Sequence, residues 1–198
     1  MAVRVVIAED EAIVRLDLKE ILEEEGYDVV GETGRGDEAV ELTRAHRPDL
    51  VILDIKMPGS DGLTAAREIT ADRLAAVLIL TAFSQRDLIE QARNAGALAY
   101  LVKPFQKSEL IPAIDIALGR FQEMKALEEQ VKTLEERFEV RKWVERAKGV
   151  LMDELGLPEN EAFGWIQKTA MRDRVRMDAI AREVVEQGRR PEPAGEGS

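Results

Sequence analysis

The sequence contains no cysteine and a single histidine, His46. Without thiols the chain can form no disulfide scaffold, no thiolate zinc site and no cysteine nucleophile. One imidazole also argues against histidine-rich metal sites and Ser-His-Asp triads. Much of the chemistry of metabolic enzymes is therefore excluded.

Long apolar runs are missing as well. No stretch approaches the ~20 residues that a membrane span requires. Residues 1–10 enter a strand-like pattern directly, without the layout of a signal peptide. These features predict a cytoplasmic protein without a membrane partner.

Glycine and proline contribute only 14 and 7 of the 198 residues, whereas 45% of the residues are hydrophobic and 34% are charged. This composition excludes collagen-like and wholly disordered chains. The net charge of -11 argues against nucleic acid, but residues 1–120 hold 14 Lys+Arg against 22 Asp+Glu, while residues 141–190 hold 11 against 9. A basic segment thus follows an acidic body, and charge alone leaves open whether that segment is a solvated surface or a nucleic-acid site.

Five apolar segments are typical of strands, and four of them are the continuous runs that buried parallel strands require. They are Val3–Ala8, Tyr27–Thr33, Leu50–Leu53, Ala75–Thr81 and Ala97–Val102. The segments between them carry apolar residues at helical spacing. This alternation over about 120 residues predicts an α/β fold with an open, doubly wound parallel sheet, in which ligands bind at the carboxyl ends of the strands.

A long helix is predicted to follow. Ala117, Met124, Val131 and Phe138 recur every seven residues, and Leu127 and Leu134 complete an a/d seam. Residues 121–140 therefore form a helical, coiled-coil-like linker that either connects two domains or pairs two chains into a homodimer through 117–141.

The C-terminal part is predicted to be a small all-α domain of three helices over 141–187. The long helix continues through Leu151, a turn follows at 156–160, and further helices cover roughly Glu159–Met171 and Met177–Gln187. Residues 188–198 are expected to be a disordered tail. The core is expected to contain Ala147, Leu151, Phe163, Ile166, Ala170, Ile180 and Val184.

Polar residues cluster where the predicted strands end. Glu9 and Asp10 follow the first strand, Asp54 the third, Thr81 the fourth and Lys103 the fifth. These positions share one edge of a parallel sheet. Converging carboxylates repel one another unless a hard cation such as Mg²⁺ lies among them. With an ammonium and a hydroxyl nearby, the middle carboxylate is suited to carry a phosphoryl group.

The motifs Val6–Glu11, Asp54–Gly62, Thr81-Ala82 and Lys103–Phe105 resemble the receiver domain of two-component response regulators, and the match covers residues 3–120. The resemblance implies strand order 2-1-3-4-5 and a cis peptide at Lys103-Pro104. It also implies phosphorylation of Asp54 by a histidine kinase, Mg²⁺ bound by Glu9, Asp10, Asp54 and the carbonyl of Lys56, and switch residues Thr81, Tyr100 and Lys103. Glu9 departs from the family, which commonly has Asp there.

Residues 141–187 resemble the ANTAR domain, the RNA-binding output module of antitermination regulators. The motifs are Val144–Met152, Glu161–Ile166, Thr169–Met171 and Ile180–Val185, with Ile166-Gln167 where the family often has Leu-Arg. A basic group expected outside the core suits phosphates and unpaired RNA bases. Its members are Arg146, Lys148, Lys168, Arg172, Arg174 and Arg176. Trp165 is interpreted as a half-buried core residue, with base stacking as its alternative role.

The resemblance places the chain among phosphorylation-dependent antitermination regulators, in which phosphorylated Asp54 controls binding to RNA hairpins of nascent transcripts. Such a protein is not a metabolic enzyme, although a receiver can catalyse its own phosphotransfer and dephosphorylation. The alternatives are a DNA-binding output built on a helix-turn-helix and a protein-interaction output without nucleic acid. Gly34–Ala39 also fits a loose dinucleotide fingerprint, but it follows the second strand rather than the first and is interpreted as coincidence.

Overall fold

A computed structural model describes residues 2–82 and 86–191. The chain divides into two compact units, Met1–Ala126 and Leu127–Ser198, and each is treated by itself below. Among the described residues, no helix combines the length and the apolar character needed to cross a membrane.

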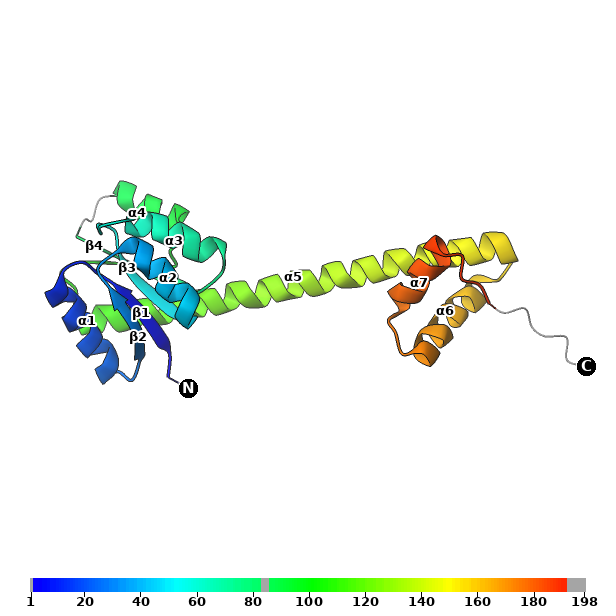
Figure 1. Cartoon of the computed structure of the whole chain (residues 1–198), viewed down its shortest axis with the longest axis horizontal. Coiled ribbons are helices and arrows are strands. Elements are labelled where there is room, and N and C mark those ends of the chain that lie inside the picture. Colours follow the sequence, from blue (N-terminus) through cyan, green and yellow to red (C-terminus); the bar gives the residue numbers. More distant parts are fainter. Residues whose placement is uncertain (1, 83–85, 192–198) are drawn as a thin grey trace, which may run out of the picture. The chain divides into compact units, whose positions relative to one another are not determined.

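The first unit contains a parallel sheet of five strands in the order β2-β1-β3-β4-β5 (Figure 1). The strands are β1 (Arg4–Ala8), β2 (Asp28–Thr33), β3 (Leu50–Asp54), β4 (Ala76–Thr81) and β5 (Ala99–Val102). Every residue of the central strands β3 and β4 is buried, which explains why these strands are continuous apolar runs in the sequence. The predicted fold class and strand order are confirmed.

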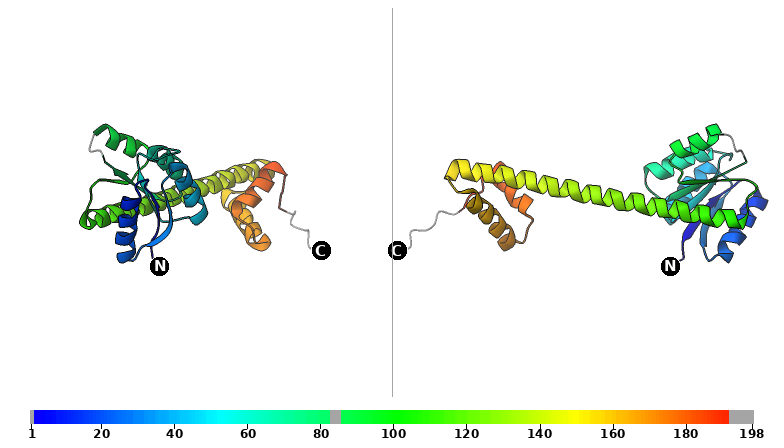
Figure 2. Two further views of the ribbon diagram at one scale, coloured as in Figure 1. Left: turned by 60° about the vertical axis from the view of Figure 1, so that its left-hand side comes forward. Right: turned by 180° about the vertical axis from the view of Figure 1, so that it is seen from behind.

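Helices cover both faces of this sheet (Figures 1 and 2). Helices α2 (Gly36–His46), α3 (Gly62–Ala71) and α4 (Arg86–Asn94) pack on one face, and α1 (Ala12–Glu24) and the start of α5 (Lys107–Leu155) pack on the other. Alternate residues of β3 divide between the two cores, with Val51 and Leu53 facing one and Leu50 and Ile52 the other. Each fully buried aliphatic side chain of this kind contributes roughly 1.5–3 kcal/mol to folding.

The second unit is a three-helix unit formed by the C-terminal part of α5 with α6 (Glu159–Asp173) and α7 (Met177–Glu186) (Figures 1 and 2). Gly156 ends α5 with φ +67°, a left-handed conformation that favours glycine. The predicted core is confirmed except for one residue. Phe163 is 40% exposed, because the core face of α6 passes through Ala162, Ile166 and Ala170.

Only four of the six residues of the predicted seam lie on the outside of α5, because Ala117 and Met124 pack on the core of the receiver unit. Leu127, Val131, Leu134 and Phe138 are between 47% and 68% exposed, and they contact no core of the described residues. A Cβ atom at Gly149 would meet nothing within 4 Å, so this glycine of α5 is not required by a close approach of another backbone.

The expected C-terminal tail begins with residues that contact the helical unit. Arg189 pairs with Asp173 and Glu183, and Arg190 pairs with Glu154. These arginines therefore connect residues from all three helices. Residues 192–198 of the predicted tail lie outside the described residues.

Candidate functional site

The carboxylates predicted to converge at the sheet edge lie close together in the first unit. Ligand atoms of Glu9, Asp10 and Asp54 lie within 4.8 Å of one another. They follow or end β1 and β3, whose carboxyl ends meet at this edge. A cleft of about 370 Å³ opens there and is lined by Asp10, Glu11, Asp54, Ile55, Lys56, Thr81, Ala82 and Lys103.

Lys103 joins two of these carboxylates. Its Nζ atom donates to Glu9 Oε2 at 2.9 Å and lies 3.3 Å from Asp54 Oδ2. The Lys103-Pro104 peptide is cis, as expected. Burial lowers the pKa of Lys103, but the hydrogen bond to Glu9 and the negative charges of Asp54 and Glu9 outweigh it and raise the pKa above its usual value. Lys103 is therefore a fixed cation at neutral pH.

Burial dominates the ionisation of both acids. Desolvation raises the pKa of Asp54 and of Glu9, while Lys103 opposes the rise. Asp54 Oδ1 accepts from the Ile55 N–H at 2.8 Å, which fixes the carboxylate plane. Three carboxylates around one ammonium leave an excess of negative charge, and oxygen ligands of this kind suit Mg²⁺. The donor set thus fits a magnesium ion.

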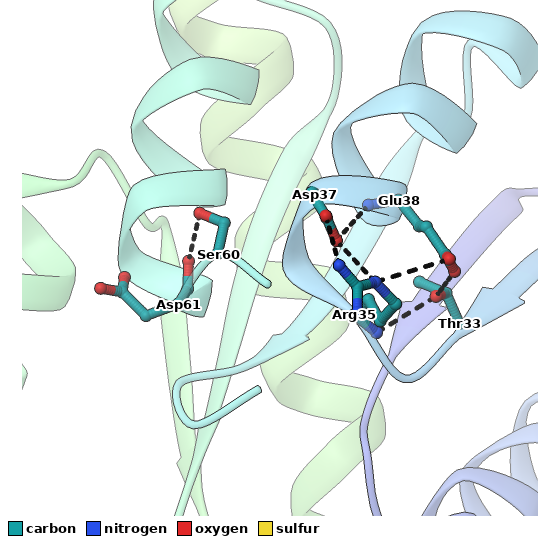
Figure 3. A network of polar contacts seen from close by, with 6 residues as sticks. All are labelled: Thr33, Arg35, Asp37, Glu38, Ser60 and Asp61. Atoms are coloured by element: carbon teal, nitrogen blue, oxygen red, sulfur yellow. Dashed lines mark hydrogen bonds and ion pairs between the residues drawn. The ribbon is translucent and has the colours of Figure 1, made fainter. Parts of the chain in front are cut away.

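Two loops are packed tightly beside the site. A Cβ atom at Gly62 would lie 1.8 Å from the carbonyl oxygen of Asp54, so only glycine lets α3 begin there. Figure 3 shows the adjoining polar network, in which Arg35 pairs with Asp37 at 2.6 Å and Thr33 donates to Glu38. A Cβ atom at Gly36 would lie 2.0 Å from the carbonyl oxygen of Ser60. The close approach of the Ser60 backbone thus accounts for Gly36 of the loose dinucleotide fingerprint without a pyrophosphate.

The two other switch candidates lie on neighbouring strands. Thr81 ends β4 and is buried, whereas Tyr100 on β5 is 47% exposed. Sequence reasoning did not foresee two contacts at this site. Glu11 lies 3.7 Å from Lys103 Nζ, and the Arg15 guanidinium donates to the carbonyl of Glu9. No spacing in the sequence indicated either contact, because both depend on how the start of α1 lies beside the sheet edge.

The basic residues predicted to bind RNA fall into different environments in the second unit. Lys148 was expected outside the core, but its side chain is only 8% exposed and is held by Glu159 at 2.7 Å and Glu145 at 2.9 Å. That placement was wrong, because Lys148 neighbours the core residue Ala147 and faces the start of α6. Arg172 and Arg176 are exposed and pair with Asp173 and Asp178, respectively.

Other cations of this unit lie on its surface with no carboxylate of the described residues within 4.0 Å. Lys168 and Arg174 are exposed. Arg146 lies over the ring of Trp143, as does Arg182, which the sequence analysis did not single out. Only the packing of α7 beside α5 brings Arg182 to that ring, so no sequence spacing indicated it. Trp165 packs half-buried against the core, which confirms that interpretation.

Comparison with known families identifies both units. The response regulator receiver domain matches residues 5–115, and the ANTAR domain matches residues 132–185. The chain belongs to the response regulators and joins a receiver domain to an ANTAR domain.

Individual relatives agree with this assignment. The transcriptional regulatory protein PdtaR of Mycobacterium tuberculosis is 60% identical over 183 residues, which cover 92% of this chain and 89% of PdtaR. The chemotaxis protein CheY of Bacillus subtilis is 41% identical over 60% of this chain and all of CheY. This chain is therefore similar to PdtaR over both of its domains and to CheY over its receiver alone.

Solved structures match the receiver. The signal receiver domain of the putative response regulator NarL from M. tuberculosis has a TM-score of 0.57 and 32% identity, and the match covers 60% of this chain and 97% of that one. A CheX-CheY-BeF3-Mg+2 complex from Borrelia burgdorferi has a TM-score of 0.54 and 28% identity, covering 57% and 86%.

Proposed function

We propose that a histidine kinase phosphorylates Asp54 and that this phosphorylation controls RNA binding by the ANTAR domain and thereby transcription antitermination. The observation that supports this proposal most directly is the position of Asp54. Its buried carboxylate lies beside two further acids and a fixed ammonium at the sheet edge. The ANTAR domain on the same chain supplies the output.

The phosphoacceptor chemistry follows from this arrangement. A carboxylate oxygen of Asp54 forms the new O–P bond as the P–N bond of the kinase phosphohistidine breaks, and the histidine nitrogen keeps the electron pair. Glu9, Asp10, Asp54 and the carbonyl of Lys56 would hold Mg²⁺, which supplies charge neutralisation for the phosphoryl oxygens. The related CheY structure is a complex with BeF3 and Mg+2, which supports a magnesium ion in a receiver of this fold.

In this proposal, Lys103 and Thr81 bind the phosphoryl group on Asp54. The Lys103 ammonium already lies between Glu9 and Asp54, so a phosphoryl oxygen on Asp54 gives it a stronger anionic partner. Thr81 donates its hydroxyl to the same group, and Tyr100 turns inward from its half-exposed position. The same residues support autophosphorylation from small phosphodonors and dephosphorylation by water.

The C-terminal unit binds hairpins of nascent transcripts in the cytoplasm. Residues 141–190 are the net positive part of an acidic chain, with 11 Lys+Arg against 9 Asp+Glu. Arg146, Lys168, Arg172, Arg174 and Arg176 are exposed there and are the proposed phosphate or base contacts, whereas Lys148 acts through the fold of the unit. PdtaR is named a transcriptional regulatory protein, which fits an output on transcription.

A second copy of the chain covers the seam on α5. Four large apolar side chains at heptad spacing are exposed along this helix, and burying such a seam against an identical helix is the usual way to stabilise it. A homodimer through 117–141 would present two ANTAR domains to one transcript.

The phosphoacceptor assignment is tested by incubating the protein with acetyl phosphate and Mg²⁺ and measuring the phosphorylated fraction by intact-mass spectrometry. We expect a gain of one phosphoryl group in the wild type and none in Asp54→Asn. The control Asp17→Asn changes an exposed carboxylate of α1 and should label normally. Undiminished labelling of Asp54→Asn contradicts the assignment.

The RNA-binding assignment is tested by retention of labelled cellular RNA and duplex DNA fragments on the immobilised full-length protein. We expect retention of RNA that weakens as salt rises. Tight, sequence-specific retention of duplex DNA would favour a helix-turn-helix output. Retention of neither nucleic acid would favour a protein-interaction output.

A further inference from the structure

Trp143 carries two guanidinium groups at the surface of the ANTAR domain. The Cζ atom of Arg182 lies 4.6 Å from the ring centroid, and that of Arg146 lies 5.7 Å from it. Both distances are within the range of cation–π contacts. The ring packs partly buried against the C-terminal core, whereas both arginines are exposed. The two cations are therefore held over a fixed aromatic platform.

These two arginines differ from four other arginines of the unit in having no acidic partner. Arg172 and Arg176 each lie within 3.0 Å of an aspartate, and Arg189 and Arg190 pair with acids as well. Within the ranges 2–82 and 86–191, no carboxylate lies within 4.0 Å of the guanidinium of Arg146 or Arg182. Two positive charges thus remain unneutralised at one place on the surface.

A guanidinium packed on an indole is prepared for a planar, anionic ligand. Because the ring already restricts the arginine, less side-chain entropy is lost when a ligand binds. The N–H edge remains available for phosphate oxygens, and its free face can stack on a base. Bases inside a duplex have both faces covered by their neighbours, so a stacking site of this kind selects an unpaired base.

We propose that Trp143, Arg146 and Arg182 form a binding site for an unpaired RNA base and its phosphate. This inference rests on the proposed RNA-binding function and names the part of the domain that distinguishes loop from stem. Arg182, the closer of the two arginines to the Trp143 ring, would stack on the base. Arg146 would add a second positive charge for the phosphate.

The test uses RNA hairpins selected by the full-length protein, with Mg²⁺ and acetyl phosphate present, from a pool with randomised loops. The chain has two tryptophans, so Trp165→Phe leaves Trp143 as the only indole. We expect the emission of Trp143 to be quenched as the selected hairpin is added and to stay unchanged with the paired stem alone. The matched protein Trp143→Phe, which reports Trp165, should show no quenching.

Substitutions of Arg182 separate stacking from charge. Arg182→Gln should weaken hairpin binding about tenfold or more. It should also reduce the slope of the logarithm of the binding constant against the logarithm of the salt concentration by about 0.7. Arg182→Lys keeps the charge but loses the planar group, so affinity and quenching should fall while the salt dependence is retained. Lys132→Gln removes one exposed charge from α5 in the same unit and should bind as the wild type does.

The outcomes separate this inference from the function on which it rests. Selection of no RNA by the wild type overturns both. The inference alone is overturned if the wild type selects hairpins, both Arg182→Gln and Arg182→Lys bind them as tightly as the wild type does, and Trp143 is not quenched. If circular dichroism shows that Arg182→Gln has lost helicity, the inference is tested by the quenching of Trp143 in Trp165→Phe. Quenching by the selected hairpin supports the inference, and its absence overturns it.

Discussion

Glu9 and Asp54 share one ammonium group, and this arrangement determines how the receiver site responds to pH. Both acids are buried, and desolvation raises the pKa of each despite the nearby Lys103. A carboxyl whose pKa is higher in the folded than in the unfolded state binds protons better when folded. Its contribution to stability is therefore present at low pH and is lost as pH rises through the raised pKa.

We expect the free energy of unfolding of the receiver, without divalent cations, to fall as pH rises above the usual pKa values of 3.8 for Asp and 4.5 for Glu. Asp54→Asn removes one of the responsible groups and should melt a few degrees higher than the wild type at neutral pH. Thermal melts followed by circular dichroism check this. Asp17→Asn is the control, and a lower melting temperature for Asp54→Asn contradicts the account.

The same excess of negative charge predicts a response to metal. A magnesium ion held by Glu9, Asp10 and Asp54 would bind only the folded receiver, so millimolar Mg²⁺ should raise the melting temperature of the wild type. Asp10→Asn removes a ligand that is exposed in the structure, and its melting temperature should respond much less. Removal of the metal with EDTA should reverse the effect. An equal response of both proteins would show that the ion binds elsewhere.

At the scale of elements, buried segments were predicted better than surface contacts. Val51, Leu53 and their neighbours form a continuous apolar run because both faces of β3 are buried, and such a run is visible in the sequence alone. The partner of Lys103 was not visible, because it depends on the reach of the Glu9 side chain. Phe163 was expected in the core and is partly exposed, whereas Lys148 was expected on the surface and is buried. Only the packing of α6 on α5 determines which of these side chains are covered.

The position of the α6 core face predicts unequal effects of two truncations. Ile166 is fully buried, so Ile166→Ala should lower the free energy of unfolding of the C-terminal unit by about 2–5 kcal/mol. Phe163 is 40% exposed, and Phe163→Ala should change it by less than about 1 kcal/mol. Urea titration of both variants measures the difference. The reverse order would place Phe163 in the core after all.

The seam on α5 predicts a change of oligomeric state. Leu134 is 63% exposed, so Leu134→Glu should leave the fold intact but destabilise any pairing of two α5 helices. Sedimentation velocity of the phosphorylated protein should show a dimer for the wild type and a monomer for this variant. Glu136→Gln alters an exposed residue on the side of the helix away from the seam and is the control. A wild type that is monomeric at all concentrations contradicts the proposed homodimer.

At the scale of the whole molecule, an acidic receiver and a net positive ANTAR segment occur on one chain. Residues 1–120 hold an excess of eight acids, with 14 Lys+Arg against 22 Asp+Glu, and this charge repels RNA wherever the receiver comes near it. In the proposed function, phosphorylation of Asp54 would change the anion beside Lys103 and Thr81 in the receiver domain, and the ANTAR domain would carry the output. Control by Asp54 requires that the state of this site alter the affinity of the second domain for RNA.

Crosslinking and sequencing of bound RNA, with Asp54 phosphorylated and unphosphorylated, tests this coupling most directly. We expect phosphorylated wild type to crosslink to a defined set of transcript leaders, through loops that precede terminators. Unphosphorylated wild type and Asp54→Asn treated with the same phosphodonor should recover few of them. Recovery of the same RNAs at the same level from all three proteins would contradict phosphorylation control, and recovery of no RNA from any of them would contradict the RNA output itself.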